Sequence, residues 1–288
     1  MARWPSPTPT AGSVTPKTCC KARIEVSGPK QRRRVLVLLF LVWIASCTVA
    51  GPDKKDQGFF ALPPLPPPHE YGDVVIDQAS REAGEDAVVF SHWSHRARYT
   101  CRVCHFELPF AMEANGSGIS EKAHSKGHFC AACHDGVTAF GHTNKNCSKC
   151  HTGVSTDKQR AFKKFRESLK LPEGDYGNKI DWVEAKKRGL IEPKQSILEP
   201  DFEPIPYDQE FEVPAAWSMI SPAHFSHDEH MQWLECSNCH PDIFAIEKKG
   251  TQHFLMKHIL DDKFCGACHT KVAFPIDDCK ACHPSMKY

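Results

Sequence analysis

The segment Cys101-Arg102-Val103-Cys104-His105 is one of six copies of a single pentapeptide pattern, C-x-x-C-H, in this 288-residue chain. The paired cysteines are Cys101 and Cys104, Cys130 and Cys133, Cys147 and Cys150, Cys236 and Cys239, Cys265 and Cys268, and Cys279 and Cys282. The histidines that directly follow them are His105, His134, His151, His240, His269 and His283. No other C-x-x-C pair occurs in the chain, so the six copies form one system.

The C-x-x-C-H pattern is typical of covalent attachment of haem c. Two thiols at this spacing form thioethers to the two vinyl groups of haem, and the adjacent imidazole becomes the proximal iron ligand. Zinc ribbons also use C-x-x-C pairs but do not require a histidine after every pair. A thioredoxin-like redox site needs a single pair on a βαβ unit, and a disulfide scaffold is a further alternative. The six histidines favour six covalent haem c groups.

The chain contains an internal duplication with a spacing of 135 residues. This distance separates Cys101 from Cys236 and Cys130 from Cys265, and it also separates the upstream histidines His92 and His95 from His227 and His230. Each copy begins with Phe-Ser-His-x-x-His and continues with three attachment motifs. The sequence therefore predicts two equivalent modules with three haems each.

Each module resembles a trihaem cytochrome of the c3/c7 class, over roughly residues 70–152 and 220–284, and the flanking sequences resemble c7-type modules found in tandem in exported cytochromes of metal-reducing bacteria. In that class the paired upstream histidines are distal iron ligands. The resemblance implies that His92 pairs with His105 and His95 with His134. It implies the same for His227 with His240 and for His230 with His269.

The distal ligand of the third haem in each module departs from the family pattern. The family places this histidine four residues before the second attachment motif, where this chain has Lys126 and Asp261. For the iron on His151 we predict His124, with His128 and His142 as alternatives. For the iron on His283 we predict His258, with Met256 and His253 as alternatives. Of the remaining histidines, His69 and His224 are expected to be surface or packing residues.

The N-terminal segment predicts export. Three arginines precede an eleven-residue apolar run, Val35 to Ala45, which is too short to span a bilayer. The following Ile44-Ala45-Ser46-Cys47 resembles a bacterial lipobox, in which Cys47 becomes lipidated and anchors the chain to a membrane. An ordinary secretory signal is the alternative. Residues 1–30 do not fit a signal peptide, and we expect a start codon that has been assigned too early.

The predicted organisation has five parts. Residues 1–47 form the signal peptide and lipobox, 48–70 a Pro-rich tether, 71–152 the first trihaem module, 153–219 a helical and acidic Pro-rich linker, and 220–288 the second module. We expect a hairpin from residues 73–77 and 87–90, helices over 157–171 and 181–188, and a solvated linker over 192–212. The modules should be small, loop-rich and mainly α-helical with minimal β-structure, because haem supplies much of their apolar bulk.

The leading functional hypothesis is an electron-transfer protein, not an enzyme, that relays electrons across the periplasm or outer membrane in anaerobic respiration. The expected partners are other periplasmic or outer-membrane c-type cytochromes, and the expected location is the periplasmic face of the outer membrane or the cell surface. Without residues 1–47 the chain has 28 basic and 34 acidic residues, which disfavours nucleic-acid binding. The alternative is a multihaem reductase, of the nitrite, hydroxylamine or tetrathionate type, with one open haem site at His151 or His283.

Overall fold

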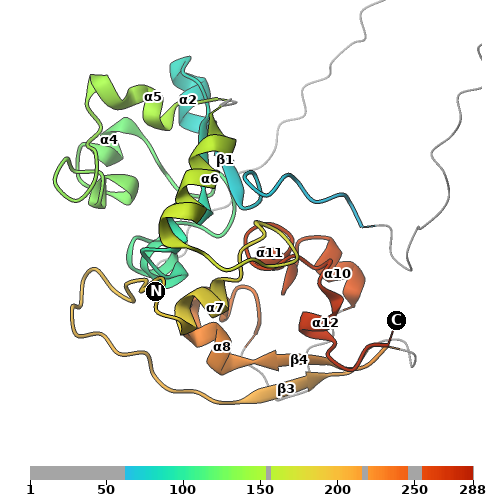
Figure 1. The fold of residues 1–288 in the computed structure, drawn as a ribbon. Helices are drawn as coiled ribbons and strands as arrows, with labels where there is room; N and C mark the ends of the chain where they lie inside the picture. Colours follow the sequence, from blue (N-terminus) through green and yellow to red (C-terminus); the bar gives the residue numbers. More distant parts are fainter. Residues whose placement is uncertain (1–61, 154–156, 216–219, 246–254, 288) are drawn as a thin grey trace, which may run out of the picture. The chain divides into compact units, whose positions relative to one another are not determined.

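A computed structural model describes residues 62–153, 157–215, 220–245 and 255–287, and residues 62–288 form one compact unit. The predicted signal peptide with Cys47, most of the Pro-rich tether and the alternative ligand His253 lie outside the described residues. None of the helices in the described ranges is long and apolar enough to cross a membrane. Loops and short helices dominate the unit, as expected from the sequence (Figure 1).

The elements of the first half are β1 (Asp73–Ile76), α2 (Gln78–Ala83), β2 (Val88–Ser91), α3 (His92–Arg96), η1 (Val103–Glu107), α4 (Glu121–His124), η2 (Phe129–Ala132), η3 (Asn144–Asn146) and α5 (Cys147–Cys150). Then follow α6 (Lys158–Leu169) and α7 (Trp182–Lys187). The second half contains β3 (Glu210–Val213), β4 (Ala223–Ser226), α8 (His227–Met231), α9 (Cys236–Cys239), α10 (Met256–Leu260), α11 (Gly266–His269) and α12 (Cys279–Cys282).

Each half begins with a two-stranded antiparallel hairpin that leads directly into the first histidine pair. Strand β1 pairs with β2 and places Asp73 opposite Ser91, which confirms the predicted hairpin. Strand β3 pairs with β4 and places Glu210 opposite Ser226, which lies 135 residues after Ser91. The duplication therefore includes the hairpins as well as the attachment motifs, and the second hairpin is drawn in orange in Figure 1.

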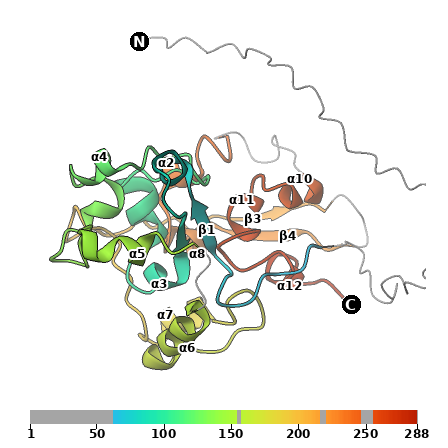
Figure 2. The same cartoon turned by 90° about the horizontal axis from the view of Figure 1, so that it is seen from above.

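The buried core lies where the two halves meet. It contains Trp93 and Ala97 from the first half, Trp233 from the second, and a group from the connecting segment: Phe162, Leu171, Ile180, Trp182, Ala185 and Ile191. Helices α6 and α7, seen from another direction in Figure 2, supply Phe162 and Trp182 to this cluster. The predicted helix pair is thus present and packs at the module junction.

A buried polar network joins the first attachment loop to the fourth. The Arg102 guanidinium donates to the carboxylates of Glu107 and Glu235 and, at 3.1 Å, to the carbonyl of Gln195. Its side chain is 5% exposed, and that of Glu107 is 3% exposed. The guanidinium also lies 3.7 Å from the ring centroid of Phe202. Because Glu235 directly precedes Cys236, this network fixes the two modules against each other.

The acidic segment 192–212 is exposed over most of its length, at residues 198–201 and 203–210, as its composition predicts, but its two ends are fixed in the fold. Lys194 pairs with the Arg98 and Thr100 backbone, the backbone N–H of Ile197 donates to Glu107 at 2.8 Å, and residues 210–213 form strand β3. The charges of β3 lie on its exposed face, while Phe211 and Val213 are half-buried. The prediction counted acids and prolines but missed this alternation, which is the period of a strand.

The stability of the junction should depend on pH through Glu107. Burial alone would raise the pKa of Glu107, but hydrogen bonds from the Ile197 backbone N–H, the Ser196 hydroxyl and Arg102 outweigh it and hold the pKa below its usual range. A carboxyl group with a lowered folded-state pKa stabilises the fold above its unfolded pKa of about 4.3 and loses that contribution as the pH falls.

We therefore expect the unfolding free energy of the wild type to fall more steeply below about pH 4.3 than that of Glu107→Gln. Guanidinium unfolding at a series of pH values measures this difference. Glu167→Gln is the matched control, because Glu167 is exposed and its one ion pair in the described residues, with Lys163, is a loose surface pair at 3.9 Å. Parallel pH profiles for wild type and Glu107→Gln would contradict the expectation.

Candidate haem-attachment and iron-ligand sites

All six C-x-x-C-H motifs contain a short helical turn. In the third, fourth and sixth motifs the turns α5, α9 and α12 run from one cysteine to the other. The remaining motifs lie on or beside η1, η2 and α11. Residues three apart on a helical turn lie on the same side, so each turn presents both thiols in one direction.

The ring of each motif histidine is held by a backbone carbonyl. In four motifs the Nδ1 atom donates to the carbonyl of a phenylalanine four to six residues downstream, at 2.7–3.0 Å. These carbonyls belong to Phe110, Phe140, Phe244 and Phe274. With the proton on Nδ1, the lone pair of Nε2 remains free to bind a metal.

The third motif of each module is anchored differently. His151 donates from Nδ1 to the carbonyl of Asp86 at 2.7 Å, and His283 donates to that of Ser221 at 2.7 Å. Both acceptors lie in the loop between the two strands of their own module's hairpin. The last motif of each module is therefore fastened to the start of that module.

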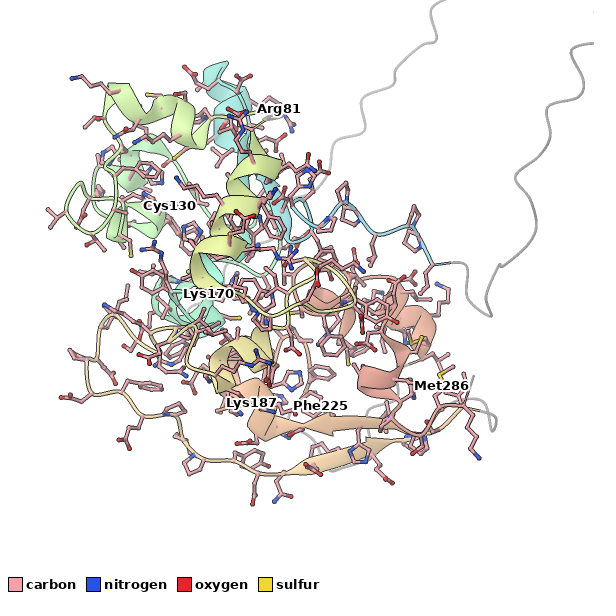
Figure 3. All side chains as sticks on the ribbon, viewed as in Figure 1. Arg81, Cys130, Lys170, Lys187, Phe225 and Met286 are labelled. Carbon is pink, nitrogen blue, oxygen red and sulfur yellow. The ribbon has the colours of Figure 1, made fainter. Side chains whose placement is uncertain are left out.

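The upstream histidines are positioned by the hairpins. His92 donates from both its backbone N–H and its Nδ1 atom to the carbonyl of Gly72, at 3.1 and 2.7 Å. His227 makes the same two bonds to Gln209, at 3.1 and 3.0 Å. Phe225, labelled in Figure 3, stacks on His230 with ring centroids 4.5 Å apart.

Three of the four pairs implied by the family resemblance face each other. The ring centroids are 6.4 Å apart for His92 and His105, 6.2 Å for His95 and His134, and 6.2 Å for His230 and His269. Two imidazoles that share one metal through Nε2, with bonds of about 2 Å, have centroids about 6 Å apart. The spacing therefore fits a bis-histidine iron.

The fourth pair is not brought together in this way. The ring of His227 contacts Tyr207, Phe211 and Phe225, while His240 contacts Phe244. Within the described ranges, no ring contact joins His227 to His240. Their pairing stays a prediction of the resemblance.

Burial favours the neutral form of five histidines of the facing pairs. It lowers the pKa of His92, His95 and His269 to about 4 in each case, with neighbouring imidazoles adding to the effect. Burial also lowers the pKa of His105 and His230. A neutral imidazole is the form that binds a metal, so these environments favour the ligand state.

His124 has the surroundings of a ligand for the third haem. Its Nε2 atom is buried and has no hydrogen-bond partner, and its ring lies 6.0 Å from that of His142. Burial lowers the pKa of His124, followed by the neighbouring His142, His134 and His151. These observations favour His124, and they keep His142 as the nearest alternative.

His258 lies at the first turn of α10, where its Nδ1 atom accepts a hydrogen bond from the Leu255 backbone N–H at 3.1 Å. Its role as the distal ligand of the iron on His283 stays a prediction, with Met256 as the alternative within the described residues.

The thiols of successive motifs lie near one another. Burial raises the pKa of Cys104 to about 12, with additional effects from Cys101 and from Cys133 and Cys130 of the second motif. The same electrostatic proximity connects further motifs in pairs: Cys130 with Cys150, Cys239 with Cys101, Cys268 with Cys101, and Cys265 with Cys282. The six motifs thus form one connected series that crosses between the modules at Cys101.

Sequence reasoning found the cysteines and the paired histidines but not the groups that hold them. In four motifs a phenylalanine follows the histidine by four to six residues, and this repeated spacing could have predicted which backbone carbonyl accepts from the histidine ring. The carbonyls of Asp86 and Ser221 carry no such signal, because they are backbone groups 65 and 62 residues away from their histidines. His69 and His224 bind no other histidine ring in the described part of the chain and contact Glu70 and Glu212 instead.

Comparison with known proteins identifies one family. Residues 88–152 and 223–284 both match the family described as cytochrome c7 and related cytochrome c. Among solved structures, the C-terminal hexaheme fragment of GSU1996 is 26% identical, over 76% of this chain and 99% of that one, with a TM-score of 0.24. The dodecaheme cytochrome c GSU1996 is 24% identical, over 75% of each chain, with a TM-score of 0.26. No curated protein matches the chain.

Proposed function

Because the chain carries two tandem multihaem modules of the cytochrome c7 type, we propose that it relays electrons across the periplasm or outer membrane through six covalent haem c groups. Each bound haem supplies an iron that alternates between Fe(III) and Fe(II), one electron at a time. The contribution of the protein is attachment, ligand position and electrostatics.

The observation that carries this proposal is the connected series of attachment motifs. Thiols of the second and third motifs are neighbours, those of the first and second are neighbours, and Cys101 is a neighbour of Cys239 and Cys268 in the other module. A relay needs every carrier to lie beside another. Two hydrogen bonds support such an arrangement at the module boundary: the Arg102 backbone N–H donates to the Trp233 carbonyl at 2.9 Å, and the Asn238 side-chain amide donates to the His105 carbonyl at 3.1 Å.

A carrier differs from a reductase in having no open iron. We expect low-temperature EPR of the oxidised protein to show only low-spin ferric signals. Their integral should be about six spins per chain, equal to the haem content measured by the pyridine haemochrome assay. A stoichiometric high-spin signal that shifts on addition of nitrite would favour a reductase instead. The haems on His151 and His283 would then be the first to examine.

The facing pair His92 and His105 gives a sharper test of ligation. In His92→Ala we expect one iron to lose its distal ligand, so that about one sixth of the ferric signal becomes high-spin, as measured by EPR integration. His224→Gln is the control, since the His224 side chain is 47% exposed and pairs only with Glu212 in the described residues. An unchanged low-spin spectrum for His92→Ala would refute the assignment.

We further propose that Cys47 carries the lipid that anchors the mature chain to a membrane, with other c-type cytochromes as redox partners. The support is the basic, apolar and small-residue order of residues 32–47. Fractionation of cells that express Cys47→Ser tests the anchor: the variant should move from the membrane to the soluble fraction. Retention in the membrane fraction would exclude a lipid anchor at this cysteine.

A further inference from the structure

A cationic side chain lies inside the module junction. Arg96 is the last residue of α3 and directly follows His95. Its guanidinium lies 5.2 Å from the ring centroid of Trp182 and 4.9 Å from that of Trp233. Trp182 belongs to the connecting segment and Trp233 to the second module, and both are buried. Two aromatic faces thus hold the cation in place.

This cation has no carboxylate partner among the described residues. The Nη1 atom of Arg96 donates to the carbonyl of Val272 at 3.4 Å, and its Nε atom is buried without a hydrogen-bond partner. Arginine keeps its charge in folded proteins, so the junction holds a positive charge that no carboxylate of the described residues neutralises. An arginine without a carboxylate partner at this junction costs folding stability, so we infer that the electric field of its charge has a function.

The cation lies beside attachment motifs of both modules. Cys101 packs against the buried cluster that contains Trp182 and Trp233. The backbone N–H of Val272, whose carbonyl Arg96 contacts, donates to the Cys268 carbonyl at 2.8 Å. The thiols of Cys101 and Cys268 accordingly oppose the lowering of the Arg96 pKa by burial. Cys101 belongs to the first motif of the first module and Cys268 to the second motif of the second. The cation therefore lies beside the crossing point of the series, near one motif from each side.

The duplication shows that this charge is specific to one module. The residue 135 positions after Arg96 is Met231, at the end of α8. The histidines next to it, His95 and His230, occupy equivalent positions. The histidine pair that precedes the attachment motifs is thus present in both modules, whereas the adjacent cation is present in only one.

We propose that Arg96 is a fixed cation that raises the reduction potentials of the two haems attached at Cys101 and Cys104 and at Cys265 and Cys268. The proposal rests on the proposed six-haem relay. A nearby positive charge favours the Fe(II) state, which carries one positive charge fewer than Fe(III). An electron is then held more strongly at these two haems than it would be without the cation.

Replacement of Arg96 by a neutral side chain tests the proposal. In Arg96→Met and Arg96→Gln we expect the reduction equilibrium of two haems to change about tenfold each toward Fe(III), equal to about 59 mV for a one-electron couple. Spectroelectrochemical titration gives the six potentials, and NMR of the haem methyl groups during stepwise oxidation assigns them. Arg96→Lys should retain most of the wild-type potentials, because it keeps the charge.

Arg160→Gln is the matched control, since it removes the same charge from a side chain that is 82% exposed and pairs with Asp157, and it should leave all potentials unchanged. Wild-type potentials in both neutral variants would overturn the proposal, and so would an Arg96→Lys protein that behaves like Arg96→Met. Haem content and the EPR spectrum show whether all six haems are bound and low-spin. They therefore distinguish unchanged reduction potentials, which overturn this inference, from a failure of the proposed six-haem relay. A wild type that lacks haem at Cys101 or Cys265 would remove the proposed function itself, and this inference with it.

Discussion

A double variant, Cys101→Ala with Cys104→Ala, is expected not to accumulate as a folded protein, whereas Cys147→Ala with Cys150→Ala should accumulate with one haem fewer. The reason is the position of each motif. Cys101 is a neighbour of Cys239 and Cys268 in the other module, and the first attachment loop donates to the Trp233 carbonyl at 2.9 Å. The third motif is peripheral, and Cys147 is exposed.

The apolar core cannot compensate for the loss of a central haem. The buried cluster at the junction contains nine residues, which is small for a unit that spans 62–288. A structural cofactor contributes on the order of 10 kcal/mol to folding, and a whole domain has about 5–15 kcal/mol of stability. Periplasmic yield, haem content and limited proteolysis measure the outcome. A protease-resistant Cys101→Ala, Cys104→Ala protein with five haems would show that the junction folds without its haem.

Arg102→Met should lower the free energy of unfolding by about 3–5 kcal/mol, because it leaves buried carboxylates without their partner. The Glu107 side chain is only 3% exposed and that of Glu235 is 19% exposed, so water can replace little of what the guanidinium provides. The stacking of the guanidinium on Phe202 would be lost as well. Unfolding in guanidinium, followed by the loss of low-spin haem absorbance, gives the value.

Arg160→Met is the matched control for this prediction. Arg160 forms an ion pair with Asp157, but the two side chains are 82% and 71% exposed, so the loss should be below about 1 kcal/mol. Equal stabilities for Arg102→Met and Arg160→Met would mean that the buried network contributes no more than a surface pair. The modules would then be held together by the tryptophan cluster alone.

The sequence predicted the features that depend on short-range pattern. The attachment motifs, the hairpin before His92 and the helices around Phe162 and Trp182 all follow from local spacing or periodicity. The facing of His92 and His105 followed from the family resemblance. Charge and proline content predicted the exposure of most of residues 192–212 but not its fixed ends, because packing near Arg102 and pairing with β4 are long-range effects.

The features that escaped prediction are backbone acceptors and tautomers. The proton of His258 is fixed by an N–H group at the start of α10, and that of His151 by a carbonyl 65 residues away. Arg96 follows a ligand in the sequence, but its contact with Trp182 and Trp233 requires the folded junction. Such contacts are decided by three-dimensional packing, which a single sequence does not record.

The anchoring of His151 to Asp86 and of His283 to Ser221 has a consequence for maturation during secretion. A chain that emerges N-terminus first presents both acceptor carbonyls before the histidines that need them. Four of the motifs can be completed from their own next few residues as soon as the chain has emerged that far. The third motif instead connects the end of each module to its start. The ring of His151 can therefore be positioned within the first module alone, whereas the first attachment loop also needs the Trp233 carbonyl and Glu235 of the second module.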